Sequence, residues 1–499
     1  RSEDSCEQFD RIPLFARIRS YDRGEELMEV VIVGGGTAGW LSAAAFLHEL
    51  PFASITLIDK EESTPVSVGE ATLLGFERFL KERCGFPPEE YLRSMDVTLK
   101  GGILFPDWGM DGNAPWHPFT FPNIVDKWTT YQGESLESQM ALYNCSMKNQ
   151  LDRNQLDGGY ALHVDCLKLI EYVKGKIEDK ITFIQSEVKD IRRDNGIRSL
   201  FLKSGKTVRG DVFIDCTGVD SLLKDKRKRV DLSDRLYVDT AVAGHVDYIE
   251  RHRELRPFVV CHAVDDGWIW NIPLKSKIGT GLVFNRNVTD PEDAKSYLSN
   301  YWNGRTDELK VLNWNPYYDK NQWDRNVISI GLSAGFIEPL ESTGIALILE
   351  GISTAATKLK TGYFNDCDIE CYNSWMVSMF ESCTDFVNMH YSKVTKDTPF
   401  WNYVKDNYKM SETQEFYLDH MNSDDPSIMG GKDHFFGGAN WIHWLIMLGF
   451  PIKPKSYHIC EWNDPTGWKS MHHSTLRRDL TIEASENFID HIQFVDSYL

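Results

Sequence analysis

The sequence predicts an α/β protein built around a Rossmann-like sheet, and three observations lead to this fold class. The apolar run EVVIV at 29–33 is followed by the glycine-rich turn GGGTAG and by an Ala- and Leu-rich helix. A second apolar run, SITLID at 54–59, has the composition of a strand. A third, VFID at 212–215, leads into the small-residue turn CTG. Strands that alternate with helices favour a parallel sheet with helices on its faces.

The glycine-rich turn carries the strongest local motif. Gly34, Gly36 and Gly39 supply the spacing GxGxxG between a strand and a helix. The first glycine permits a tight turn, the second lets the backbone approach a pyrophosphate, and the third lets the helix pack closely on the strand. The N–H groups at the helix start would face the phosphates, and Asp59 stands where a carboxylate should accept the ribose hydroxyl groups. We therefore expect a cofactor that contains ADP.

Length and composition are ordinary for a soluble globular protein and exclude two classes of partner. The chain has 499 residues, of which 42% are hydrophobic and 26% charged. No apolar run approaches the ~18 residues of a membrane span. The net charge of −20 argues against a nucleic-acid partner, because phosphate-binding surfaces need clustered Lys and Arg. The ten cysteines form no CxxC pair, so we expect reduced thiols, no structural metal and a cytoplasmic location.

We expect three parts along the chain. Residues 1–27 begin without Met and lack the apolar segment of a secretory signal, so they are interpreted as a leader or a disordered extension. Residues 28–360 form the nucleotide-binding unit, into which two segments of a substrate-covering module, 73–159 and 226–324, are inserted. Residues 361–499 complete this module, which we expect to be largely helical, because helical spacing dominates 345–390. We also expect a homo-oligomer.

A first resemblance narrows the cofactor to FAD. The segment GKTVRGDVFIDCTG at 205–218 resembles the second strand and turn of the FAD-dependent monooxygenase and reductase fold, where the chain returns to the flavin. Residues 186–208 before it are predicted to form a hairpin. Val188, at the start of this hairpin, matches the position whose backbone contacts the adenine in such folds. The resemblance therefore implies an FAD-binding Rossmann-like fold rather than an NAD site.

Three further stretches point to one family. They are VGEAT at 68–72, GWIWNIP at 267–273 and FIEPLESTGIALI at 336–348. Together with GGGTAGW at 34–40, they resemble the flavin-dependent tryptophan halogenases and their relatives. The family motif WxWxIP is matched by Trp268, Trp270, Ile272 and Pro273, and the motif FxxPxxSxG is matched by Phe336, Pro339, Ser342 and Gly344. The similarity runs in order from about residue 28 to beyond HYSKVTKDTPFW at 390–401.

This resemblance implies a reaction at two separated centres. Reduced FAD and oxygen convert a halide ion (chloride, bromide or iodide) to hypohalous acid, which passes through a short tunnel to an aromatic substrate. Such an electrophile survives only where bulk water and other nucleophiles are excluded. No NAD(P)H site is evident beyond the FAD turn, so we expect a separate flavin reductase to supply FADH2 by diffusion.

The resemblance also assigns roles to individual residues. Lys100 and Glu341 match the two catalytic positions: the ammonium group binds or carries the hypohalous acid, and the carboxylate orients the electrophile or takes the proton of the ring. Thr343 and Gly344 offer backbone N–H groups at a helix start for the halide. His117 and Phe119, in APWHPF at 114–119, match the loop that stacks on the substrate ring.

The remaining assignments concern the flavin and the tunnel. Trp268, Trp270, Ile272, Pro273 and Ser342 are expected to separate the flavin from the substrate, which would favour halogenation over monooxygenation. The expected FAD contacts are Gly34, Gly36, Thr37, Ala38, Gly39, Asp59, Ala71, Val188 and Leu332.

One region departs from the family. The tryptophan halogenases bind the amino-acid backbone of their substrate with paired tyrosines and a glutamate, whereas MNSDDPSIMGGKDHFFGGANW at 421–441 lacks them. We therefore expect an aromatic or phenolic substrate other than free tryptophan. Two alternatives remain: a flavin-dependent aromatic hydroxylase, which would need neither halide nor Lys100, and an FAD-binding scaffold without activity.

Overall fold

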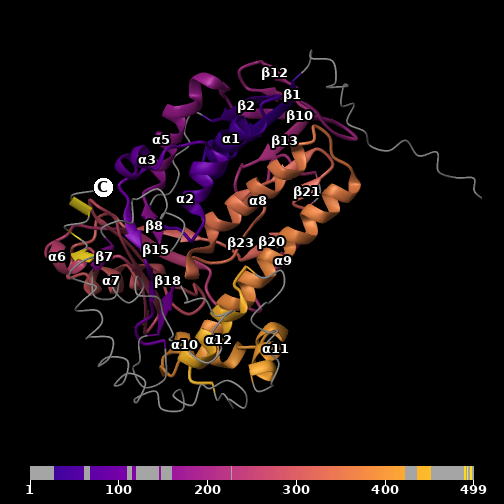
Figure 1. The fold of residues 1–499 in the computed structure, drawn as a ribbon. Coiled ribbons are helices and arrows are strands. Elements are labelled where there is room, and N and C mark those ends of the chain that lie inside the picture. The colour runs from indigo at the N-terminus through magenta and orange to yellow at the C-terminus, as the bar shows by residue number, and fades with distance from the viewer. Residues whose placement is uncertain are drawn as a thin grey trace, which may run out of the picture.

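The computed structural model describes residues 27–60, 68–108, 115–119, 145–147, 160–225, 227–421, 435–450, 488–490, 492 and 495–496. It confirms the predicted α/β class (Figure 1). All but the last residue of the proposed leader lies outside these ranges. None of the helices in the described ranges is long and apolar enough to cross a membrane.

The nucleotide-binding unit is a six-stranded sheet in the order β21-β22-β13-β1-β2-β9. The central strand β1 (Met28–Val33) pairs in parallel with β2 (Ala53–Asp59) and with β13 (Val212–Asp215). Alternate side chains of β1 enter different clusters, because strand residues point to opposite faces: Val30 and Ile32 join the main core, whereas Val31 and Val33 join a smaller one. The outer strands are β9 (Thr182–Gln185), β22 (Val327–Ser329) and β21 (Trp323–Asp324).

Helices and a hairpin cover this sheet. Helix α1 (Thr37–Glu49) contacts α5 (Cys166–Ile177) and α8 (Thr343–Leu359). The predicted hairpin at 186–208 is confirmed as β10 (Val188–Asp194) and β11 (Gly196–Leu202), joined by β12 (Thr207–Val208). Val188 packs on the smaller cluster, so the hairpin closes one face of the sheet.

The covering part is less helical than predicted. Residues 226–324 contribute most of a second, seven-stranded sheet in the order β19-β15-β18-β17-β16-β5-β6. Most neighbours in it are antiparallel, and only β16 and β5 are parallel. Its strands are β19 (Lys310–Asn313), β15 (Thr240–Val246), β18 (Ile278–Phe284), β17 (Gly267–Pro273), β16 (Val259–Val264), β5 (Gly102–Leu104) and β6 (Trp116–Pro118). Strands such as IGTGLVF are buried throughout, and such runs lack the alternation that identifies a strand in a sequence.

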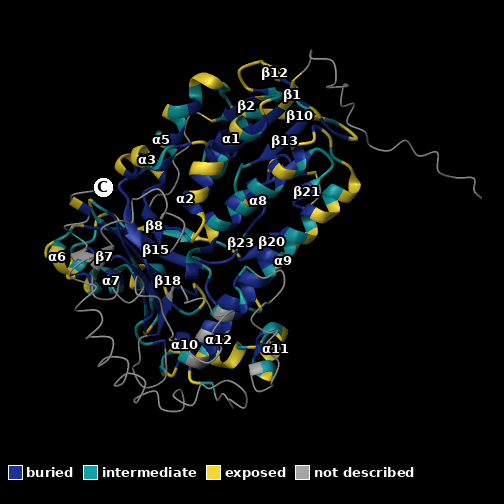
Figure 2. Cartoon of the chain, viewed as in Figure 1, coloured by how far each residue is buried: buried dark blue, intermediate teal, exposed yellow. Residues whose placement is uncertain are grey.

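The described residues between 366 and 447 lie mostly in helices. Helix α9 (Asp366–His390) begins at a capping box formed by Asn365 and Asp368 and lies beside α8 (Figure 1). Helices α10 (Pro399–Asn407), α11 (Glu412–Met421) and α12 (Gly438–Met447) gather at the far end of α9 (Figure 1). Figure 2 shows exposed residues on the outer side of α9 and buried residues along the strands of both sheets.

A smaller, three-stranded sheet accompanies the two large ones. Strand β8 (Ala161–Val164) lies between β3 (Glu70–Ala71) and β4 (Thr98–Lys100). The other elements are α2 (Phe76–Arg78), η2 (Phe79–Arg83), α3 (Pro88–Ser94), β7 (Cys145–Met147), η5 (Glu178–Lys180), β14 (Arg229–Asp231), α6 (Arg251–Glu254), α7 (Pro291–Tyr301), β20 (Tyr317–Asp319), η6 (Gly331–Ser333), β23 (Gly335–Phe336), η7 (Leu340–Ser342), η8 (Tyr391–Lys393) and β24 (Phe488–Asp490).

Candidate active site

A cavity of about 790 Å³ lies where the nucleotide-binding sheet meets the second sheet. Its size is that of a site for a cofactor or another small molecule, since such pockets span roughly 300–1,000 Å³. Predicted flavin, halide and tunnel residues all contribute to its lining. They are Thr37, Ala71, Trp268, Trp270, Ile272, Leu332, Ser342, Thr343 and Gly344.

The glycine turn at the start of α1 has the geometry that the motif predicts. A Cβ atom on Gly34 (φ +105°) would lie 2.2 Å from the carbonyl oxygen of Cys216, and one on Gly39 would lie 1.8 Å from the carbonyl oxygen of Gly34. Both positions therefore require glycine for close backbone packing. A Cβ on Gly36 would meet no atom of the described residues within 4 Å. The open side of the turn is thus at the second glycine, where the predicted pyrophosphate would approach.

Asp59 lies beside this turn at the end of β2. A Cβ on Gly35 would approach its Oδ2 to 2.3 Å, so the carboxyl group and the turn are in contact. Burial raises the pKa of Asp59, against the lowering effect of a hydrogen bond from the backbone N–H of Gly35. Ala38 packs behind the turn, against Gly331. A Cβ atom placed on Gly331 would lie 2.9 Å from the Cβ atom of Ala38. These contacts join the start of α1 to β2 and to η6.

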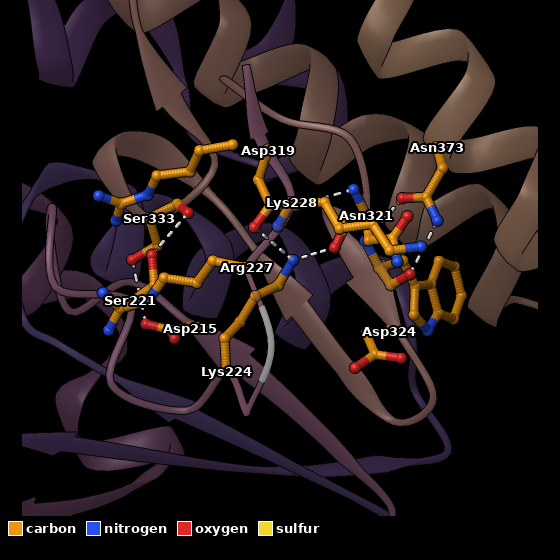
Figure 3. A network of polar contacts seen from close by, with 12 residues as sticks. Asp215, Ser221, Lys224, Arg227, Lys228, Asp319, Asn321, Asp324, Ser333 and Asn373 are labelled. Carbon is orange, nitrogen blue, oxygen red and sulfur yellow. Dashed lines mark hydrogen bonds and ion pairs between the residues drawn. The ribbon is translucent and has the colours of Figure 1, made fainter. Parts of the chain in front are cut away.

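A buried polar network holds η6 in place (Figure 3). Asp215, at the end of β13, accepts hydrogen bonds from Ser333 Oγ at 3.0 Å and from the backbone N–H of Leu223 at 2.8 Å. Buried Lys224 forms an ion pair with Asp319 at 3.3 Å. These bonds tie the turn after β13 to the segment that carries Leu332, whose side chain lines the cavity while remaining 45% exposed.

The two tryptophans of GWIWNIP lie on one face of β17, as their spacing predicts. Their ring centroids are 6.3 Å apart, and both indoles line the cavity while being almost fully buried. Trp270 packs over Gly281 on the neighbouring strand, where a Cβ would lie 2.1 Å from the indole ring. Ile272 also lines the cavity. Pro273 is outside the lining, and its carbonyl oxygen accepts a hydrogen bond from Thr98 Oγ1 at 2.5 Å.

The turn before α8 has a strained backbone. Glu341 (φ +62°) and Ser342 (φ +58°) are consecutive non-glycine residues in the left-handed region. Each such residue costs roughly 1–3 kcal/mol, and strain of this kind clusters at functional sites. The two conformations direct neighbouring residues to different places: Ser342 lines the cavity, whereas Glu341 lies outside the lining and is fully buried.

Lys100, the last residue of β4, is fully buried behind Ser342. Its Nζ donates hydrogen bonds to Ser342 Oγ at 2.9 Å and to the carbonyl oxygen of Thr72 at 3.0 Å. The Nζ atom also lies 4.8 Å from the centroid of the Phe119 ring. Burial lowers the pKa of Lys100 to about 7, although the negative charge of Glu341 opposes this shift.

Glu341 is held by two histidines. His117 Nδ1 lies 2.8 and 2.9 Å from the two carboxylate oxygens, and His390 Nε2 lies 2.7 Å from one of them. Burial would raise the pKa of Glu341, but the charge of His117 and the hydrogen bonds of both histidines outweigh it, so this pKa lies well below its ordinary value. The carboxylate is therefore ionised at neutral pH. His390 was not predicted from the sequence, because it follows Glu341 by 49 residues and carries no motif of its own.

Further contacts orient the two histidines. His390 Nδ1 lies 2.8 Å from the carbonyl oxygen of Phe386, one helical turn earlier in α9. His117 is on strand β6, and its Nε2 lies 3.0 Å from Asn440 Oδ1 on α12. The ring of Trp444 packs against that of His390 at an interplanar angle of 50°, with centroids 4.0 Å apart. The structure therefore brings together Lys100, Glu341, Ser342, His117 and Phe119, with His390 and Asn440 added from the helical part.

The residues around the cavity fit a flavin. The open Gly36 position at the start of α1 suits a pyrophosphate, because backbone N–H groups at a helix start are free to bind anions. The predominantly apolar wall of the cavity, with its two indoles, suits a planar ring system. No cluster of His, Cys, Asp and Glu suited to a metal ion occurs among the described residues.

Most of this chain is similar to known proteins. The family model described as tryptophan halogenase matches residues 29–462. Tryptophan 6-halogenase ThaL from Streptomyces albogriseolus is 28% identical over 417 residues, which cover 76% of this chain and 78% of that protein. Tryptophan 7-halogenase RebH from Lentzea aerocolonigenes is 28% identical over 417 residues, covering 76% and 79%. A solved flavin-dependent halogenase from Xanthomonas campestris has a TM-score of 0.82 at 25% identity, covering 95% of this chain and 99% of that one.

Proposed function

This chain belongs to the tryptophan halogenase family, and from that premise we propose that it makes hypohalous acid with FADH2 and O2 and delivers it through Lys100 to an aromatic substrate. Membership confirms the resemblance to this family and makes the protein a flavin-dependent halogenase, hence an enzyme. The delivery step, the oxidant and the substrate class are the proposal.

One observation carries this proposal: Ser342 lies between the large cavity and the buried Lys100. The residue lines the large cavity on one side, and its Oγ accepts a hydrogen bond from the buried Lys100 Nζ on the other. An electrophile formed in the cavity beside Ser342 could therefore reach the amine without entering bulk solvent. Exclusion of water at this point suits a reagent that water and stray nucleophiles would consume.

Bound FAD in its reduced form would supply, with O2, the oxidising power that turns halide into hypohalous acid. The chain itself would bind and orient this cofactor. Gly34, Gly36 and Gly39 shape the turn, and Asp59 lies beside it for the ribose. Thr37, Ala71 and Leu332 line the cavity on the flavin side, while Ala38 supports the turn and Val188 marks the hairpin proposed to contact the adenine. Thr343 and Gly344, at the start of α8, would hold the halide.

Lys100 and Glu341 would act on the far side of Ser342. With a pKa of about 7, the Lys100 amine is available in both protonation states at neutral pH, so it can donate a hydrogen bond to hypohalous acid or form a haloamine. The ionised Glu341 would stabilise the cationic ring and accept its proton. His117 and Phe119 would contact the substrate ring beside these two groups.

The substrate proposal is an aromatic or phenolic compound other than free tryptophan. The segment 421–441 lacks the paired tyrosines and glutamate that the resemblance would require, and its residues 422–434 lie outside the described ranges. Losing a buried partner for a charged substrate group costs several kcal/mol of binding. We further propose that a separate reductase supplies the FADH2.

The test is a product assay with the full-length protein, FAD, NADH and an added flavin reductase. A panel of indoles and phenols is offered with chloride, bromide or iodide, and products are identified by mass. Halogenated products that require both halide and reductase support the proposal. Oxygen incorporated without halogen would instead favour a hydroxylase, and reduction of FAD by NADH without the reductase would contradict the separate supply.

A further inference from the structure

Glu338 is a buried carboxyl group in the lining of the flavin cavity that no role assigned above uses. Its side chain is 1% exposed, and it lines the same cavity as Thr343 and Gly344. One oxygen, Oε1, accepts a hydrogen bond from Tyr391 Oη at 2.7 Å. The other, Oε2, has no hydrogen-bond partner in the described part of the chain. A buried polar atom without a partner costs about 1–3 kcal/mol, so it points to a ligand that completes its bonding.

The direction of the neighbouring hydrogen bonds shows which oxygen can carry a proton. Trp268 Nε1 donates to Tyr391 Oη at 3.1 Å, and Tyr391 in turn donates its proton to Glu338 Oε1. An indole N–H can only donate, so the order of this chain is fixed. Oε1 is therefore already an acceptor. A proton on the Glu338 carboxyl group would reside on Oε2, the oxygen without a partner among the described residues, in a residue that lines the cavity.

Burial favours the protonated carboxyl group. It raises the pKa of Glu338 to about 8, although the hydrogen bond from Tyr391 works in the opposite direction. The titratable groups near Glu338 are Tyr391 on η8 and Cys261 on β16, and burial raises the pKa of each well above neutrality. The Cys261 thiol also interacts electrostatically with Lys100 and Glu341. At neutral pH, Glu338 therefore presents an O–H donor rather than a negative charge.

We propose that Glu338 is an anion-binding residue, whose protonated Oε2 donates a hydrogen bond to the halide held by the N–H groups of Thr343 and Gly344. This inference rests on the proposed function. A halide accepts hydrogen bonds and cannot donate them, so it needs donors in place of its water shell. The start of α8 supplies backbone donors, and Glu338 adds a side-chain donor on the same cavity. Ionised Glu338 would repel the same anion.

Chloride binding to the full-length protein loaded with oxidised FAD tests this proposal without turnover. Line broadening of the chloride NMR signal gives the affinity at each pH. In the wild type, the affinity is expected to fall about fivefold between pH 8 and 9, because the acid loses its proton near pH 8. Glu338→Gln keeps an acceptor for Tyr391 and an N–H donor for the cavity, so this fall should be absent.

Two more variants test the role of the Tyr391–Glu338 hydrogen bond and provide a control. Tyr391→Phe removes the bond that lowers the pKa of Glu338, so the pH at which affinity falls should move upward. Glu350→Gln is the matched control: Glu350 lies on α8, accepts a hydrogen bond from Trp375 Nε1 at 2.6 Å and is outside the cavity lining. It should leave chloride binding unchanged. Lys100 also titrates, near pH 7, but it does so in wild type and Glu338→Gln alike.

The outcomes separate this inference from the proposed function. If the chloride affinity of Glu338→Gln falls with pH in the same way as that of the wild type, Glu338 does not bind the anion. That result overturns the inference alone. If the wild type binds no chloride at any pH and yields no halogenated product, the proposed function fails with it. A pH-independent Glu338→Gln beside a pH-dependent wild type supports both.

Discussion

Replacing Lys100 with methionine should remove activity and yet stabilise the protein at neutral pH. Folding lowers the pKa of Lys100 from its ordinary value of 10.5 to about 7. Each pKa unit is worth about 1.4 kcal/mol, so burying this amine costs about 5 kcal/mol at pH 7. Methionine avoids that cost but loses the hydrogen bonds to Thr72 and Ser342, each worth about 1 kcal/mol net. The expected gain at pH 7 is therefore about 3 kcal/mol.

The sign of this effect depends on pH. Between about pH 7 and 10.5, the unfolded chain binds a proton at Lys100 that the folded chain does not, so wild-type stability rises with pH relative to the variant. At pH 10 most of the ionisation cost is gone, and the lost hydrogen bonds should leave Lys100→Met less stable by about 1 kcal/mol.

Urea unfolding followed by tryptophan fluorescence at pH 7 and pH 10 measures both values. Lys203→Met is the matched control, because Lys203 is 60% exposed in the hairpin and forms an ion pair with the surface carboxylate of Glu187. Its difference from wild type should stay within about 0.5 kcal/mol at both pH values. If Lys100→Met were less stable than wild type at pH 7, or if its difference did not change with pH, the amine could not be as desolvated as its contacts indicate.

Three further predictions concern the cofactor turn, the tunnel and the carboxylate. Glu341→Gln should lower kcat for halogenation by about 10²–10³-fold and leave the Kd for FAD unchanged; a normal kcat would remove Glu341 from the reaction. Gly36→Ala should weaken FAD binding at least tenfold with little loss of stability. Gly39→Ala should instead lower the free energy of unfolding in urea by roughly 3 kcal/mol or more, because its Cβ would lie 1.8 Å from a backbone oxygen. Trp268→Phe should lower the Tm more than Trp270→Phe, since only the first indole has a hydrogen-bond partner within the described residues, a contrast worth about 1–2 kcal/mol. Equal Tm values for the two variants would contradict it.

The parts of the site that the sequence predicts are those whose residues are neighbours along the chain. The turn at Gly34, Gly36 and Gly39 works within six residues, and its packing distances follow from the motif. The spacing of Trp268 and Trp270 likewise places both indoles on one face of a strand. Local periodicity is sufficient for such features, because the side chains that act together are ordered by one secondary-structure element.

The parts that escape prediction depend on tertiary packing. His390 reaches Glu341 only because α9 runs back past the turn before α8, and Asn440 meets His117 across 323 residues of chain. Pro273 matches the family motif but lies outside the cavity lining, because alternate strand residues face opposite sides and the lining takes Trp268, Trp270 and Ile272. The second sheet was missed for a related reason: its central strands are buried on both faces, so their sequences show no alternation.

The double left-handed turn at Glu341 and Ser342 has a consequence for redesign. Apart from this turn, the two halves of the site come from separate segments: the cofactor half from α1, β17 and η6, and the acceptor half from β4, β6 and the end of α9. The acceptor half can therefore be mutated to accept larger or differently shaped ring systems, while the sequence of the oxidant-producing half is kept. Because both halves meet at the turn formed by Glu341 and Ser342, a change in this turn would displace one half relative to the other. Mutant libraries aimed at new acceptors should therefore leave these two residues unchanged.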